Sequence, residues 1–154
     1  KSKKVGYDPE IILSGRRLND NMADLLVKKL ILKMREKKMK IKNSNILIMG
    51  LTFKENCPDT RNSLVFDLIK RIQAYGCDVD VFDPWVDQNE AMHECDIEPI
   101  KQPIEGKYDA ILLAVAHDEF RELTSEQIRS FGKKNHVLYD IKYMLDADDV
   151  DGRL

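Results

Sequence analysis

Two short runs of apolar residues constrain the fold more than any other feature of the sequence. Residues 45–50 read Asn-Ile-Leu-Ile-Met-Gly, and residues 108–115 read Tyr-Asp-Ala-Ile-Leu-Leu-Ala-Val. Continuous apolar runs of this length, as opposed to alternating ones, are typical of strands buried on both faces of a parallel sheet. Both faces of such a sheet need helices to cover them, so the runs predict an α/β fold.

The segments around these runs show helical periodicity. We expect helices over 19–40, 63–75, 87–94, 118–123 and 125–131, and further strands over 77–82, 97–100 and 137–140. This alternation predicts a Rossmann-like, doubly wound, mostly parallel sheet preceded by a long helix. Asn19 or Asp20 is the expected N-cap of that helix, and Gly76 is expected just past the end of the next one.

The long helix carries apolar residues on more than one side. Its main stripe is extended by further apolar positions; together they are Met22, Leu25, Leu26, Val27, Leu30, Ile31, Leu32 and Met34. A helix that is apolar over a wide arc must be covered on more than one side. We therefore expect part of its cover to come from another domain or another subunit.

Composition narrows the class of protein. The 154 residues include 25 basic and 27 acidic ones, a formal charge of −2, which argues against nucleic acid as the main partner; we interpret the lysines within 37–42 as a solvated helix end. No apolar run approaches the roughly 18 residues of a membrane span, and no signal peptide precedes the charged start. We expect no membrane partner and a cytoplasmic protein.

The cysteines also predict a cytoplasmic protein. Cys57, Cys77 and Cys95 are scattered, with no metal-ligand spacing to any histidine, so we expect no metal site and free thiols in a reducing compartment. The sequence opens without methionine, which favours a fragment or a processed product.

The loop after the first strand is the main candidate for a binding site, because ligands of open α/β sheets bind beyond the carboxyl ends of the strands. It holds one glycine where a dinucleotide-binding turn would read GxGxxG. In place of glycines it offers Lys54 and Arg61, cations suited to phosphate, and Phe53 for a contact with a base. Spacing alone leaves open that both cations merely pair with Glu55 and Asp59.

The same loop carries a family resemblance. Residues 50–63 read Gly-Leu-Thr-Phe-Lys-Glu-Asn-Cys-Pro-Asp-Thr-Arg-Asn-Ser, which resembles the G-x-[ST]-F-K and D-x-R-x-S signature of the carboxy-terminal domain of the UDP-glucose/GDP-mannose dehydrogenase family. Residues 9–20, 81–85, 114–118, 139–142 and 151–154 agree in order. The resemblance covers essentially the whole chain and is closest to enzymes that oxidise UDP-N-acetylhexosamines for surface polysaccharide, including the Vi-antigen type.

This resemblance implies an activity for the entire protein. Such enzymes oxidise UDP-N-acetylhexosamine or UDP-glucose to the uronic acid by two NAD-dependent hydride transfers, through a thioester on a cysteine. An amino-terminal Rossmann domain holds NAD, and a long central helix builds a homodimer. Residues 1–41 then correspond to the end of the linker and dimerisation helix region, and residues 42–154 to the UDP-sugar-binding domain.

The family's cysteine motif is absent, and Cys57 has no counterpart as a nucleophile. The resemblance therefore implies no catalytic residue in this chain, which should bind the UDP-sugar without turning it over.

Binding residues follow from the resemblance position by position. Phe53 and Lys54 should contact the nucleotide and its sugar phosphate, and Arg61 should contact a phosphate of the sugar nucleotide or of NAD. Lys142 stands where relatives carry arginine, so it should face the diphosphate with its charge but without bidentate geometry. Arg16 or Arg17 should reach a substrate in the neighbouring subunit.

Three points stay open. Asp8 replaces the histidine usual in close relatives, which puts a contact at that position in doubt. The particular UDP-sugar is undecided. Two other readings of the whole chain are a stand-alone nucleotide-binding or regulatory module without catalysis and a flavodoxin-like receiver or carrier domain. The latter predicts acidic residues at the end of the first strand, where this sequence has Lys54.

Overall fold

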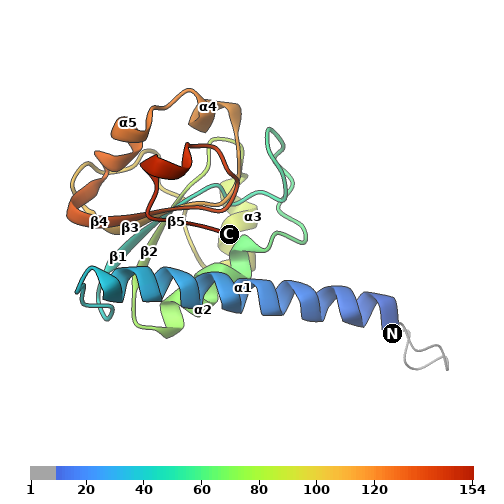
Figure 1. Cartoon of the computed structure of the whole chain (residues 1–154). Coiled ribbons are helices and arrows are strands. Elements are labelled where there is room, and N and C mark those ends of the chain that lie inside the picture. Colours follow the sequence, from blue (N-terminus) through green and yellow to red (C-terminus); the bar gives the residue numbers. More distant parts are fainter. Residues whose placement is uncertain (1–9) are drawn as a thin grey trace.

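The protein is built on one five-stranded parallel sheet (Figure 1). The computed structural model describes the backbone of residues 10–154 and the side chains of residues 21–154 apart from 94 and 95. The strands are β1 (Asn45–Met49), β2 (Asp78–Phe82), β3 (Tyr108–Leu113), β4 (Gly132–Asp140) and β5 (Gly152–Arg153), in the spatial order β2-β1-β3-β4-β5. Each neighbouring pair is parallel. The predicted α/β class and doubly wound sheet are confirmed.

Helices cover both faces of the sheet, as the apolar runs predict. The helices are α1 (Glu10–Glu36), α2 (Val65–Ala74), α3 (Gln88–Cys95), α4 (Asp118–Arg121) and α5 (Ser125–Arg129), and a 3-10 turn, η2, spans Ala147–Asp149. Figure 1 shows α1 and α2 on one side of the sheet and α4 and α5 on the other.

Alternation along β1 explains why the four residues after Asn45 are all apolar. Ile46 and Ile48 join the core on the side of α1 and α2, whereas Leu47 and Met49 join the core formed with α4 and α5. All four side chains are fully buried. Because the strand has no solvent-facing side, each position gains from being apolar, by about 1.5–3 kcal/mol per fully buried large side chain.

The first helix is longer and ends earlier than the sequence predicts. It begins at Glu10 instead of residue 19 and ends at Glu36 instead of Lys40, so the expected N-cap residues Asn19 and Asp20 lie inside it. The helix runs through Gly15, because a glycine inside a helix costs only about 1 kcal/mol relative to alanine.

Only one side of α1 is covered by the sheet domain. Leu26, Leu30 and Met34 are buried in the core shared with the sheet, while Leu25 and Leu32 remain 45% and 56% exposed. The observed burial agrees with a helix whose apolar arc is wider than one contact face can cover.

Smaller differences lie at the edges of the sheet. Residues 97–100 form no strand, since Ile100 contributes only one backbone bond, from its N–H to the carbonyl of Val81. The two-residue strand β5 follows η2 and was not predicted, because a pair of residues is too short to show periodicity. Gly76 follows α2 with φ +80°, as expected for a helix-ending glycine. No helix in the described part of the chain has the length and apolar character that crossing a bilayer demands.

Candidate functional site

The candidate site lies where the strands end. We use the name carboxyl edge for the segments that follow β1, β2, β3 and β4, namely residues 50–64, 83–86, 114–118 and 140–145. From β1 the chain adds β2 on one side and then β3, β4 and β5 on the other, so the switch point in strand order lies between β1 and β3, which is where ligands of doubly wound sheets bind. In Figure 1 the loop after β1 projects beyond the sheet on the side opposite to the end of α1.

Gly50 brings the ends of β1 and β3 into close contact. Its φ is +99°, a conformation that side chains rarely adopt, and a Cβ at this position would lie 2.5 Å from Cβ of Val115. The single glycine of the loop is therefore needed for packing between strands. It does not form part of a glycine-rich turn around a pyrophosphate.

One buried carboxylate holds three of the loops together. Asp83, at the end of β2, accepts hydrogen bonds at Oδ2 from the amides of Leu51 and Thr52, at 2.6 and 3.1 Å. Its Oδ1 accepts from the amides of Trp85 and Val86, at 2.7 and 3.1 Å. Four backbone donors therefore converge on a side chain that is fully buried.

His117, at the end of β3, supplies the fifth donor. Its Nδ1 accepts a hydrogen bond from the amide of Asn56 at 3.0 Å, so the proton is carried by Nε2, which donates to Oδ2 of Asp83 at 2.9 Å. Burial raises the pKa of Asp83, but the hydrogen bonds from His117 and from the Leu51 and Trp85 amides outweigh burial and leave this pKa below its usual range. The histidine is fully buried, so it acts as a structural link.

The loop after β1 is fixed at three further points. Ser63 donates to the carbonyl of Leu51 at 2.7 Å, and Thr60 donates to Glu90 of α3 at 2.9 Å. At the tip, Oδ1 of Asn56 accepts from the amide of Asp118 at 3.0 Å. These bonds hold the loop in one shape before any ligand binds, which reduces the entropy cost of binding.

The predicted cations differ in their surroundings. Lys54 and Lys142 are exposed, and neither ammonium group has an ion-pair or hydrogen-bond partner among the side chains that the structure describes. Lys142 follows β4, where the buried carboxylate of Asp140 fixes its backbone by accepting from its amide at 2.9 Å. Both lysines thus lie at the carboxyl edge with their charge available.

Arg61 is paired, as spacing alone allowed. Its Nε and one terminal nitrogen donate to the two carboxylate oxygens of Asp59, both at 2.9 Å, and the side chain is 84% exposed. These bonds lower the pKa of Asp59 to about 2. The remaining terminal nitrogen of the guanidinium has no hydrogen-bond partner in the described part of the chain, and a role in phosphate binding stays a prediction.

Several aromatic rings are exposed at the same edge. Phe53 and Tyr143 are 54% and 58% exposed, and Trp85 is 39% exposed. The Trp85 ring lies almost parallel to that of His117, and its Nε1 donates to Glu119 at 3.1 Å, so the ring packs against other residues of the domain. Phe53 stays free to contact a ligand.

Sequence reasoning missed Tyr143 and Arg153. Tyr143 has a positive φ of +56° and lies next to Lys142. Its hydroxyl donates to the carbonyl of Leu154 at 2.6 Å, and the Arg153 guanidinium lies 5.3 Å from the centre of its ring. The unusual feature of Tyr143 is its positive φ, which no sequence pattern reveals, so this site has no signal in the sequence.

Other expected site residues lie outside what the structure describes. These are Asp8 and the side chains of Arg16 and Arg17, although the backbone of both arginines belongs to α1. No cluster of His, Cys, Asp and Glu able to hold a metal occurs among the described residues.

Comparison with known proteins agrees with the fold and identifies the family. The sequence model of the "UDP-glucose/GDP-mannose dehydrogenase family, UDP binding domain" matches residues 47–147. The chain is 51% identical over 154 residues to the UDP-N-acetyl-D-glucosamine 6-dehydrogenases of Pseudomonas aeruginosa and of Salmonella typhi. In both comparisons the match covers 100% of this chain and 36% of the relative, so the chain spans about a third of their length.

Solved structures of dehydrogenases contain a domain with the same fold. The UDP-D-ManNAc dehydrogenase of Pyrococcus horikoshii superimposes with a TM-score of 0.69 at 25% identity, covering 92% of this chain and 32% of that one. The NDP-N-acetyl-D-galactosaminuronic acid dehydrogenase of Methanosarcina mazei superimposes with a TM-score of 0.77 at 21% identity, covering 93% and 30%; this second match shows the fold alone.

A parallel α/β domain with braced loops and free lysines at its carboxyl edge is the kind of domain that binds a phosphorylated ligand. The chain belongs to the UDP-glucose/GDP-mannose dehydrogenase family and matches the UDP binding domain of that family.

Proposed function

We propose that the entire protein is an NAD-dependent UDP-sugar 6-dehydrogenase and that this chain binds the UDP part of the substrate at its carboxyl edge. Two exposed lysines at the carboxyl edge, neither of them in an ion pair or hydrogen bond with the described residues, carry the proposal. The family match and the relatives named UDP-N-acetyl-D-glucosamine 6-dehydrogenase support UDP-N-acetylhexosamine as the substrate class, with UDP-glucose as the alternative.

The strand order brings Lys54 and Lys142 close enough to contact the same ligand. Lys54 follows β1 and Lys142 follows β4, with β3 between them. Two inter-strand steps of about 4.8 Å separate the strand ends by roughly 10 Å. Lysine side chains are long, so both ammonium groups can approach one diphosphate and neutralise its charge.

Phe53 and Arg61 complete the proposed contacts. The exposed ring of Phe53 offers an apolar surface next to Lys54. The guanidinium of Arg61 keeps free donors besides those used by Asp59, and these would reach a phosphate of the sugar nucleotide or of NAD.

NAD itself does not fit this chain in the usual way. The loop after β1 has one glycine, which packs against Val115, and its tip is bonded to His117 across the switch point. A pyrophosphate therefore finds no glycine-rich turn here. In the proposed enzyme, NAD and the nucleophilic cysteine belong to other parts of the protein, and this chain alone binds without turnover.

Residues 1–41 would belong to the linker and dimerisation region, with residues 42–154 as the UDP-sugar-binding domain. The exposed apolar residues of α1, Met22, Leu25 and Leu32, would then be covered by a second subunit. Arg16 or Arg17 of the same helix would reach the substrate of that subunit. We further propose that the enzyme is cytoplasmic and serves polysaccharide synthesis, as the sequence resemblance implies.

Titration of UDP by calorimetry tests the binding site. Lys54→Ala should weaken UDP binding by about 1.5–3 kcal/mol, the range for a hydrogen bond to a charged group. Lys70→Ala removes an equally exposed lysine from α2 and serves as the matched control, which should bind UDP like the unaltered chain. Equal affinity of Lys54→Ala and the control would refute the site.

A further inference from the structure

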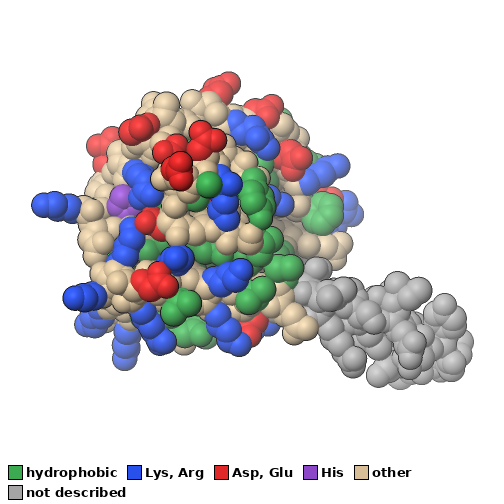
Figure 2. Space-filling model, in the orientation of Figure 1, with side chains coloured by type: hydrophobic (Ala, Val, Ile, Leu, Met, Phe, Trp, Pro, Cys, Tyr) green, Lys and Arg blue, Asp and Glu red, His purple; other side chains and the backbone are tan. Residues whose placement is uncertain are grey.

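A second concentration of positive charge lies at the opposite end of the sheet. A hollow of about 430 Å³ opens between the loop that joins α1 to β1 and the start of β4. In Figure 2, Lys and Arg side chains project at the left of the molecule, where Figure 1 places the end of α1 and the start of β1. The lining residues are Met39, Lys40, Lys42, Asn43, Ser44, Asp109, Lys133, Lys134 and Asn135. We call this hollow the lysine pocket.

The charge of the lysine pocket is not balanced within the protein. Asp109 is the only acidic residue among those that line it, and Lys133 neutralises it with contacts of 2.9 and 3.0 Å to its two oxygens. The ammonium groups of the other three lysines, at positions 40, 42 and 134, have no partner among the described residues. Three positive charges thus remain uncompensated in a chain whose net charge is −2.

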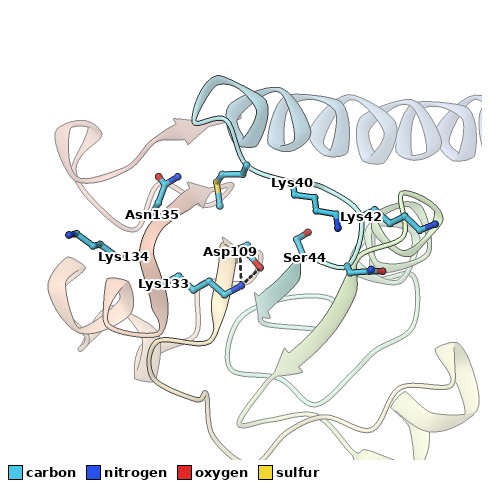
Figure 3. A pocket seen from close by; sticks show the side chains of 9 residues that line it. Lys40, Lys42, Ser44, Asp109, Lys133, Lys134 and Asn135 are labelled. Atoms are coloured by element: carbon cyan, nitrogen blue, oxygen red, sulfur yellow. Dashed lines mark hydrogen bonds and ion pairs between the residues drawn. The ribbon is translucent and has the colours of Figure 1, made fainter.

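Figure 3 shows how these side chains are arranged. Lys133 points to Asp109, whereas Lys42 and Lys134 extend outward on opposite sides of the hollow. Like charges without a counter-ion repel one another, and side chains of this length relieve the repulsion by spreading apart. An anion in the hollow would attract the lysine ammonium groups and draw these side chains inward.

The walls of the pocket are fixed by hydrogen bonds. The amide of Asn43 donates to the carbonyl of Gly76 at 2.7 Å, and the Ser44 hydroxyl donates to the carbonyl of Ile41 at 2.7 Å. Across the hollow, the Asn135 side chain donates to the carbonyl of Lys37 at 3.1 Å and so ties β4 to the end of α1. The pocket therefore keeps its shape, and only the lysine ends are left to move.

We propose that the lysine pocket is a binding site for a small anion that carries two or more phosphate groups. Three free ammonium groups match several phosphate oxygens, and each such contact is charge-assisted. The hollow falls within the roughly 300–1,000 Å³ range of small-molecule sites and exceeds what one phosphate needs. It is separate from the carboxyl edge, because it lies at the amino ends of the same parallel strands.

Inorganic pyrophosphate is the probe that tests this proposal. We expect titration of the chain, followed by amide nitrogen–proton NMR, to shift the signals of residues 39–44 and 133–135. Binding should weaken as salt is raised, since exposed charges are screened. The double variant Lys40→Gln/Lys134→Gln should lose at least tenfold in affinity for pyrophosphate.

The matched control removes the same charge elsewhere. Lys70 and Lys101 are exposed and lie outside the pocket, so Lys70→Gln/Lys101→Gln should bind pyrophosphate within twofold of the unaltered chain. Equal weakening in both variants, or signals that shift only at residues 50–64 and 140–145, would overturn the proposal. Shifts in the pocket caused by a single-stranded oligonucleotide but not by pyrophosphate would overturn it as well.

Discussion

Asp83→Asn should destabilise the protein strongly, although it alters a single atom of the side chain. The carboxylate accepts three hydrogen bonds at Oδ2 and two at Oδ1. Asparagine offers one oxygen and one NH₂ group, and the NH₂ group cannot accept. If the oxygen of asparagine accepts the three hydrogen bonds that Oδ2 of Asp83 accepts, its NH₂ group takes the place of Oδ1. The amides of Trp85 and Val86 then face a group that is itself a donor.

The size of the effect follows from those two orphaned amides. Each donor left unsatisfied costs about 1–3 kcal/mol, and since both are only partly buried we expect a loss of about 2–4 kcal/mol in the free energy of unfolding. Urea unfolding measures it, and Trp85 is the only tryptophan of the chain, so its fluorescence reports on this corner.

Asp87→Asn is the matched control. Asp87 is exposed and caps α3 by accepting from the amides of Asn89 and Glu90. Asparagine caps helices as well as aspartate does, so this variant should change stability by less than about 0.5 kcal/mol. A difference below 1 kcal/mol between the two variants would show that Asp83 does not hold the loops together in the way described.

Two further changes test other parts of the structure. Gly50→Ala should reduce the free energy of unfolding by about 2–4 kcal/mol, because of the strained φ and of overpacking against Val115. Gly106→Ala, with open space around it, should reduce it by only about 1 kcal/mol. Equal melting temperatures for the two variants would contradict the close approach of β1 and β3. Burial lowers the pKa of His136, as do the charges of Arg129 and Lys37, so the unfolded chain binds a proton more readily. Stability should therefore fall as the pH drops below 6.5, the ordinary pKa of histidine. Urea unfolding at pH 7, 6 and 5 should show that the stability of His136→Gln changes less with pH than that of the unaltered chain. The same change in both proteins would show that His136 does not cause the pH dependence.

The sheet was predictable because its central strands are buried on both sides. In the runs 45–50 and 108–115 every residue except Asn45 and Asp109 is buried, and this pattern leaves few alternatives. The start of α1 was missed, since one glycine in a helix costs little and its neighbours decide the outcome. The two-residue β5 gives no periodic signal at all.

The carboxyl edge was predictable as a place but not in its internal contacts. Lys54 and Lys142 follow strands, and parallel strands end at one edge, so topology alone brings them there. The link between Asp83 and His117 joins residues 34 positions apart, and its geometry depends on how three loops fold. For Arg61, spacing allowed pairing with Asp59 or a free guanidinium, and only the coordinates show the pair.

The most direct test of the central claim is the position of bound UDP. Titration of the chain with UDP under amide nitrogen–proton NMR should shift signals in residues 50–64, 114–118 and 140–145, around Lys54 and Lys142. Saturable shifts confined to those segments are the expected result. Shifts centred elsewhere, or none at millimolar UDP, would contradict a UDP site built from the cations of the carboxyl edge.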